Sequence, residues 1–230
     1  MNNGTIRLDP TGFPMIWVSE IGLYVHGLPV TKMQFEHFLC DATDGHFDSR
    51  WYDEILRLNP RVAARRIWSG NYWNAFLSGI LPAEAERFAS WCGPGYRLLR
   101  TSEWHRLYRA LEKQSTTLAE TELLADLAPH HRELIVQVER AVEETCTQTG
   151  DRCHMTERTL MRLGVIEWTA LEGPNPNLWA GLGEPHPSFC GNLFFPAEKH
   201  LIQPANAETR RLASFGFRLA FDPVSVQENQ

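Results

Sequence analysis

The chain contains 230 residues and carries a formal net charge of −6 at pH 7. Hydrophobic residues make up 43% of it and charged residues 22%, which is typical of a globular protein and excludes wholesale disorder and fibrous repeats. The acidic balance argues against a protein that coats nucleic acid. No apolar run approaches the roughly 20 residues that a helix needs to cross a bilayer, so we expect no membrane association. The length allows one domain, or at most two.

The N-terminal residues lack the basic start and apolar stretch of a secretory signal, so we expect a cytoplasmic protein. The five scattered cysteines fit reduced thiols in that compartment; they are Cys40, Cys92, Cys146, Cys153 and Cys190. Cys146 and Cys153 form a local pair followed by His154, but zinc would need a fourth ligand and a shorter first spacing. We expect ordinary thiols and no metal there, and spacing alone leaves open whether the two sulfurs pair.

The first predicted elements are two short strands, over 16–19 and 23–26, on either side of a glycine turn. A helix is then expected over 30–39. Thr31 is a favourable N-cap for it, and Gln34 lies three residues later, as a capping box requires.

A second core helix is predicted over 81–92. Pro82 suits its first turn, because a proline lacks only an N–H that has no partner there, and Gly93 is placed to end it. Apolar residues at helical spacing give this segment one buried face.

The middle of the chain, about 105–160, is rich in leucine and glutamate. It predicts amphipathic helices over 118–127 and 132–145, separated at Pro129. Because about 50 residues make a marginal core alone, we interpret this hairpin as an insertion rather than a separate domain.

Strands are expected again late in the chain, over 165–169 and 215–221. In the second, apolar residues alternate and therefore predict one buried face along its whole length. The stretch between these strands is rich in proline and reads as a long, irregular loop.

Five segments, taken in order, resemble the formylglycine-generating enzyme (sulfatase-modifying factor) domain family, a branch of the C-type-lectin-like fold. They are Leu28-Pro-Val-Thr-Lys-Met-Gln-Phe-Glu-His-Phe38, Gly79-Ile-Leu-Pro-Ala-Glu-Ala-Glu-Arg-Phe-Ala-Ser-Trp91, Tyr96-Arg-Leu-Leu-Arg-Thr-Ser-Glu-Trp104, Leu163-Gly-Val-Ile-Glu-Trp-Thr169 and Ser214-Phe-Gly-Phe-Arg-Leu-Ala220. The resemblance implies a single α+β domain over 1–230, of the C-type-lectin-like, formylglycine-generating type. It would have short, irregular strands, two core helices and the helical insertion at about 105–160.

Two glutamates in these segments, Glu103 and Glu167, each stand one residue before a tryptophan. A large ring can cover the edge of a core while the neighbouring carboxylate pairs locally. We therefore assign both glutamates to the scaffold, with Arg97 and Arg218 as partners for buried or rim carboxylates.

Members of this family that make formylglycine bind copper(I) with two late cysteines a few residues apart, which requires two soft thiolates converging on one metal. The late part of this chain offers only Cys190. The resemblance therefore implies a divergent member without catalytic residues or a cofactor, a pseudoenzyme. Iron-dependent relatives need clustered histidines, whereas the nine histidines here are scattered.

Large rings in loop-like sequence are candidates for an interface: Trp68, Tyr72, Trp73, Trp179, Phe194 and Phe195. The alternative, that these rings cover a loop-rich fold from inside, stays open. Arg61 and Arg65 lie one turn apart in a basic run, which favours a solvated face or an acidic protein partner over nucleic acid.

The resemblance implies a non-catalytic protein-binding or adaptor subunit in a hetero-complex. Degenerate relatives serve in bacterial regulatory, signalling or defence assemblies. The alternatives are a metal- or cysteine-dependent oxidase of the same family and a hypervariable ligand-display protein. The partner, the oligomeric state and the position of the insertion relative to the ancestral cleft do not follow from the sequence.

Overall fold

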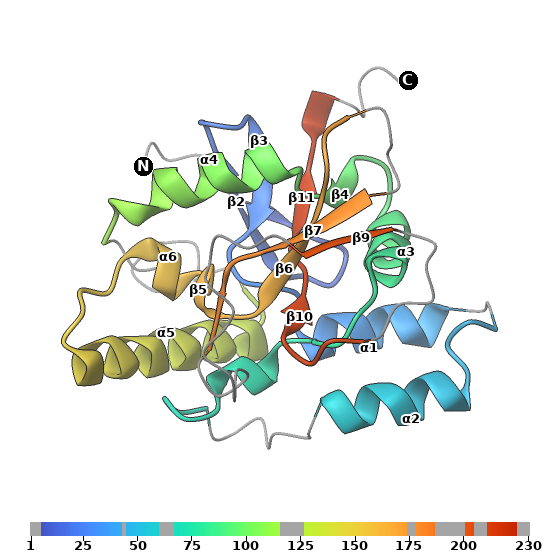
Figure 1. Cartoon of the computed structure of the whole chain (residues 1–230), viewed down its shortest axis with the longest axis horizontal. Coiled ribbons are helices and arrows are strands. Elements are labelled where there is room, and N and C mark those ends of the chain that lie inside the picture. The colour runs from blue at the N-terminus through green and yellow to red at the C-terminus, as the bar shows by residue number, and fades with distance from the viewer. Residues whose placement is uncertain are drawn as a thin grey trace.

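The computed structural model (Figure 1) describes residues 6–42, 45–59, 67–115, 127–173, 178–186 and 211–224, and the backbone of 201–204. The architecture is α+β, as predicted. The helices are α1 (Lys32–Asp41), α2 (Ser49–Leu58), the 3₁₀ helix η1 (Tyr72–Ala75), α3 (Pro82–Cys92), α4 (Thr101–Glu112), α5 (Pro129–Thr149) and α6 (Met155–Arg158). The strands are β1 (Arg7–Leu8), β2 (Pro14–Val18), β3 (Leu23–His26), β4 (Tyr96–Leu98), β5 (Arg162–Gly164), β6 (Ile166–Ala170), β7 (Leu178–Leu182), β8 (Glu184–Pro185), β9 (Leu201–Pro204), β10 (Phe215–Gly216) and β11 (Leu219–Phe221).

The strands form short, separate sheets. A five-stranded sheet has the order β1-β2-β3-β11-β4 with antiparallel neighbours, so β11 from the end of the chain lies between two early strands. A four-stranded sheet has the order β10-β6-β7-β9, in which β10 runs parallel to β6. β5 and β8 make a third, parallel pair. Chain segments far apart in sequence are therefore neighbours in every sheet.

The early elements confirm the sequence prediction. β2 and β3 form the expected hairpin, and α1 begins after Thr31. The Gln34 N–H donates to Thr31 Oγ1 at 3.1 Å, and the Thr31 N–H donates to Gln34 Oε1 at 2.9 Å. This reciprocal capping box satisfies two backbone donors that a helix start would otherwise leave unpaired.

The later helices agree in part. α3 covers the predicted range, with Pro82 in its first turn and Gly93 as its C-cap. α5 replaces the helix predicted over 132–145 but is longer, and Pro129 begins it rather than separating two helices. Residues 118–126 of the other predicted helix lie outside the described residues. Within the described parts of the chain, no helix combines the length and the apolarity needed to cross a bilayer.

The prediction of one continuous strand over 215–221 is wrong. The segment is divided into β10 and β11, which belong to different sheets. The alternation of buried residues is nonetheless real, since Phe215, Phe217, Leu219 and Phe221 all belong to one apolar cluster. The ladder is interrupted because the Phe217 carbonyl accepts from the Val30 N–H at 2.9 Å, next to the start of α1.

Two apolar clusters lie on opposite faces of the five-stranded sheet. One contains Val25 and Ala220 together with buried residues of α4 and α5. The other contains Met15 and Leu219 together with buried residues of α1, α2 and α3. In Figure 1 the first group of helices lies on the left and the second on the right. α5 is thus part of the main core rather than a projection from it.

A buried ion pair joins the sheets. Arg218 Nη2 donates to Glu167 Oε1 at 2.7 Å, and Arg218 Nε donates to Glu167 Oε2 at 3.0 Å, with both side chains 1% exposed. The guanidinium also donates to the carbonyls of His26 (2.9 Å) and Thr159 (2.6 Å). Trp104 Nε1 donates to Glu167 Oε2 at 3.1 Å. The ion pair therefore ties β6 to α4 through Glu167, and to β3 and the end of α6 through Arg218.

The prediction that Arg97 and Arg218 pair with buried or rim carboxylates is confirmed, and their partners are Glu103 and Glu167. Besides the pair formed by Arg218, Arg97 makes two parallel contacts with Glu103, at 2.7 Å and 2.8 Å. Such bidentate pairs fix orientation as well as distance.

We expect Glu167→Gln to lower the free energy of unfolding by about 3–5 kcal/mol, because it leaves a buried guanidinium uncompensated. Urea denaturation followed by tryptophan fluorescence measures the loss. The double variant Glu167→Leu/Arg218→Met removes both charges and should lose less stability than Glu167→Leu and Arg218→Met lose together as single variants. Additive losses would contradict a coupled ion pair.

Asp9 forms a second buried polar centre. Its Oδ1 accepts from the backbone N–H of Thr11 and of Phe13, both at 2.8 Å. Its Oδ2 lies 3.0 Å from His26 Nε2 and 3.0 Å from Gln34 Nε2. Burial raises the pKa of Asp9, but the hydrogen bond and charge of His26 and the other hydrogen bonds outweigh it and bring the pKa to about 2.

The depressed pKa makes stability depend on acid. The carboxylate stabilises the fold above its unfolded pKa of 3.8, and this contribution is lost as pH falls towards about 2. The difference corresponds to about 2 kcal/mol. In urea denaturation, the stability gap between wild type and Asp9→Asn should narrow through this pH window. A gap that stays constant would show that Asp9 does not titrate there.

Candidate functional site

Trp68 is an exposed ring among the residues predicted for an interface. It is 56% exposed. Its backbone N–H donates to Asn71 Oδ1 at 2.9 Å, and its ring lies so close to Gly70 that a Cβ there would collide with it. The ring therefore packs over a glycine of its own turn, where a side chain would have no room.

Three other predicted rings are buried, which corrects the expectation that they are available to a partner. Tyr72 donates its hydroxyl hydrogen to the Leu163 carbonyl at 2.6 Å. Trp73 stacks on His186 with ring centroids 3.7 Å apart. Trp179, on β7, packs within the apolar cluster beside α1, α2 and α3. Internal partners therefore account for all three rings as parts of the core.

The remaining predicted residues lie outside the described parts of the chain: Arg61, Arg65, Phe194 and Phe195. Cys190, on which the argument against a copper site rests, lies outside them as well. Among the described residues, no three His, Cys, Asp or Glu side chains converge in a way that could hold a metal ion.

The exposed face of α2 was not predicted. α2 begins at Ser49, where the Trp51 N–H donates to the side chain of its N-cap, Asp48, at 2.9 Å. Trp51 and Ile55 are buried, one turn apart. Tyr52 and Leu56, also one turn apart, are 41% and 49% exposed. The helix therefore presents two large apolar side chains to solvent.

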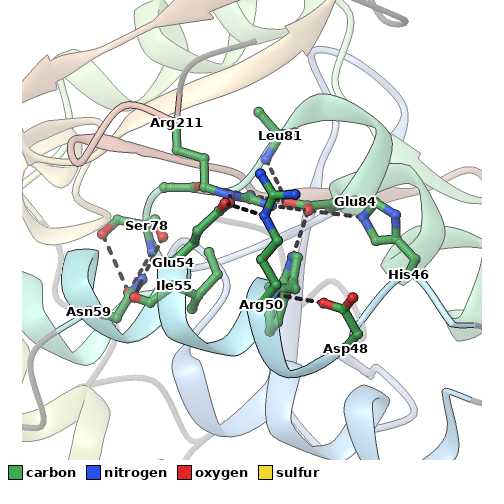
Figure 2. Close-up of polar contacts among 12 residues, drawn as sticks. His46, Asp48, Arg50, Glu54, Ile55, Asn59, Ser78, Leu81, Glu84 and Arg211 are labelled. Atoms are coloured by element: carbon green, nitrogen blue, oxygen red, sulfur yellow. Dashed lines mark hydrogen bonds and ion pairs between the residues drawn. The ribbon is translucent and has the colours of Figure 1, made fainter. Parts of the chain in front are cut away.

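The buried carboxylate of Glu84 holds the inner face of α2 (Figure 2). Trp51 Nε1 donates to Glu84 Oε1 at 2.6 Å, and His46 Nε2 lies 3.1 Å from the same oxygen. The Leu81 N–H donates to Glu84 Oε2 at 2.9 Å. Arg211 completes the centre with two contacts of 2.6 Å, one to each carboxylate oxygen. Glu84 therefore joins α2 and α3 to a residue near the C-terminus.

The charge of Glu84 and its hydrogen bonds also fix how α2 is oriented. Burial raises the pKa of Glu84, and the hydrogen bonds from Arg211 and the Leu81 N–H outweigh it, so the pKa lies below its ordinary value. Arg211 also donates to Glu54 of α2 at 3.2 Å and to the Gly79 carbonyl at 3.0 Å. Glu84 therefore stays ionised, and its partners fix the rotation of α2 about its axis.

The end of α2 is fixed separately. Asn59 Nδ2 donates to the Ser78 carbonyl at 2.7 Å, and the Ser78 N–H donates to Asn59 Oδ1 at 3.0 Å (Figure 2). The helix is thus held near both ends, and its outer side chains have a defined position.

We expect Glu84→Gln to lower the free energy of unfolding by about 2–3 kcal/mol, since it removes the buried charge that accepts from Arg211, Trp51 and the Leu81 N–H and leaves Arg211 only the more exposed Glu54 as an anion. Hydrogen exchange at residues 49–58 should accelerate most, because α2 loses its inner contacts. Arg50→Ala is the matched control. It removes an exposed contact of 3.5 Å to Glu54 and should change stability by less than about 0.5 kcal/mol. Uniform acceleration across the chain would contradict a local role.

A polar cavity of about 480 Å³ lies elsewhere, where α5 ends and α6 begins. Cys146 and Cys153 both line it, together with Lys113, Arg152, His154 and Arg158. The two thiols are hydrogen-bonded to each other, and neither is in a disulfide in this structure. The cysteines that sequence spacing left unassigned are therefore in direct contact.

In comparisons with protein-family models and with curated proteins, nothing matches this chain. Its function is therefore inferred from the geometry of the described residues.

Proposed function

We propose that this chain is a non-catalytic protein-binding subunit with an adaptor role, and that its partner docks on the outer face of α2. The observation that carries the proposal is the pair Tyr52 and Leu56, large apolar side chains exposed on a helix whose inner face is held by Glu84. Contiguous exposed apolar groups on a rigid element are typical of protein interfaces rather than of free surfaces.

The energetics favour docking at this face. A tyrosine supplies a large contact area with few rotatable bonds, and a preformed helix needs no ordering on binding. Arg50, Asp53 and Arg57 are exposed beside the apolar pair and would form a polar rim of mixed charge. Such a face suits a partner with an apolar groove bordered by charged groups.

The proposed scaffold is the C-type-lectin-like fold of the formylglycine-generating family. Two sets of contacts support it. The glutamates of two resembling segments, Glu103 and Glu167, are engaged by Arg97 and Arg218. Ion pairs of this kind assign the motif residues to holding the fold together, which suits a member that displays a surface. The implied hetero-complex follows from the same resemblance.

The proposal is tested with Tyr52→Ser/Leu56→Ser in the tagged full chain, captured from its native cell extract. Wild type should retain a stoichiometric protein partner, and the variant should lose it by about thirtyfold, the effect of removing about 2 kcal/mol of central contact energy. Quantitative mass spectrometry of the captured material measures the ratio.

Leu8→Ser/Val224→Ser is the matched control, because both side chains are exposed to a similar degree (44% and 58%) away from α2. This variant should keep the partner. Recovery of the wild-type chain alone, or equal retention by the α2 variant, would overturn the proposal.

A further inference from the structure

The contact between Cys146 and Cys153 results from the way α5 ends. Cys146 lies in the last turn of the helix, which stops at Gly150 in the left-handed conformation, with φ +76°. The Asp151 N–H then donates back to the Cys146 carbonyl at 3.0 Å. This reversal returns the chain along the helix end and brings the Cys153 thiol to that of Cys146. Two thiols seven residues apart in sequence are thus neighbours in space.

The two sulfurs have different surroundings. Cys146 is buried, whereas Cys153 is partly exposed to the cavity. The hydrogen bond between them lowers the pKa of Cys153, and the charge of Arg158 lowers it further against the effect of burial. The same hydrogen bond and burial raise the pKa of Cys146. Cys153 is therefore the more acidic thiol of the pair, and Cys146 donates the hydrogen bond that stabilises its thiolate.

Arg158 lacks sufficient compensation in the reduced, uncharged form of this site. It is 6% exposed, and its Nε atom is buried without a hydrogen-bond partner. Its contact with the exposed Glu143 spans 3.6 Å, which is long for an ion pair. A buried guanidinium needs a nearby anion. A thiolate on Cys153 supplies that anion within the same cavity.

The cavity suits a small ligand. Its volume of about 480 Å³ lies within the range of about 300–1,000 Å³ that small-molecule sites occupy. Three cationic residues line it, Lys113, Arg152 and Arg158, against two acidic ones, Glu143 and Asp151. The balance of positive charge stabilises a thiolate and the hydroxide or alkoxide that leaves when it reacts.

We propose that this cavity is a redox-active dithiol site, in which Cys153 reacts with a small hydroperoxide and Cys146 closes a disulfide with it. The Cys153 thiolate attacks one peroxide oxygen, so that an S–O bond forms, the O–O bond breaks, and the leaving oxygen takes a proton from solvent. Cys146 then attacks the Cys153 sulfenic acid: the S–S bond forms, the S–O bond breaks, and water leaves with the Cys146 proton. The sulfurs lose two electrons, which reduce the hydroperoxide to an alcohol or to water.

Limited oxidation of the folded full chain with hydrogen peroxide tests the assignment. After alkylation of the remaining thiols, mass spectrometry should show a Cys146–Cys153 disulfide as the first product, reversed by dithiothreitol. Cys146→Ala should instead leave a sulfenic acid on Cys153 that dimedone captures. Arg158→Gln should slow the reaction by about tenfold, the effect of raising the pKa of Cys153 by one unit, and Arg158→Lys should restore most of the rate.

Cys40→Ser is the control, because Cys40 is exposed and plays no part in the proposed reaction; disulfide formation should proceed unchanged in it. Cys153→Ser, at a partly exposed position, should abolish the linkage while keeping the unfolding midpoint of wild type. Oxidation of Cys40 ahead of the pair, a first product without the linkage, or equal rates for the two Arg158 variants would overturn the proposal.

Discussion

Buried carboxylates, each held by a cation or by backbone N–H groups, are the interaction on which this fold of short strands depends. Short strands in separate sheets provide few continuous ladders, so polar contacts must fix how distant segments meet. Glu167 does this at the centre, where Arg218 and Trp104 converge on it. Because a charge inside a protein is tolerated only with its partner in place, each such centre admits one arrangement of the segments that supply it.

Arg218 lies at the break between β10 and β11 and joins the sheets on either side of it. In a regular strand over 215–221 it would stand on the face opposite the buried phenylalanines. Here its guanidinium instead donates to Glu167 and to the carbonyls of His26 and Thr159, with 1% of its side chain exposed. These contacts anchor the chain at the point where it passes from β10 to β11. One buried cation thereby joins the two sheets that the strands belong to.

Local patterns were sufficient for much of the fold. The Thr31 and Gln34 pair predicted the start of α1, and Pro82 and Gly93 predicted the limits of α3, because caps depend on residues a few positions apart. That Glu103 and Glu167 belong to the scaffold, and that Arg97 and Arg218 pair with carboxylates, was predictable because ionised groups beside large rings need compensation. The division of 215–221 was not, since it depends on contacts with residues as distant as His26 and Val30.

The candidate sites were harder to predict, because they also depend on contacts between residues far apart in sequence. Loop sequence around Tyr72 and Trp73 does not reveal that Leu163 and His186 cover these rings. The sequence spacing of Cys146 and Cys153 argued against a zinc site, but it could not show that a turn at Gly150 brings the two thiols together. The sequence did contain a signal for α2, which is the apolar stripe formed by Trp51, Tyr52, Ile55 and Leu56. Periodicity alone, however, does not tell which part of such a stripe is buried by the rest of the protein.

The buried ion pair of Glu84 and Arg211 determines which part of this apolar stripe faces the core. From Trp51 to Leu56 the apolar stripe spans about 140° of the helix surface, more than one core contact needs. Apolar burial alone would therefore allow the helix to roll and hide Tyr52 and Leu56. The hydrogen bond from Trp51 to Glu84 at 2.6 Å has a direction, and breaking it would leave the buried Trp51 indole N–H without its acceptor. A wholly apolar contact in place of Glu84 and Arg211 would stabilise the helix as well. It would not determine whether Trp51 and Ile55 or Tyr52 and Leu56 face the core. The hydrogen-bonded ion pair therefore selects the orientation of α2 in which Tyr52 and Leu56 face outward, as the proposed docking requires.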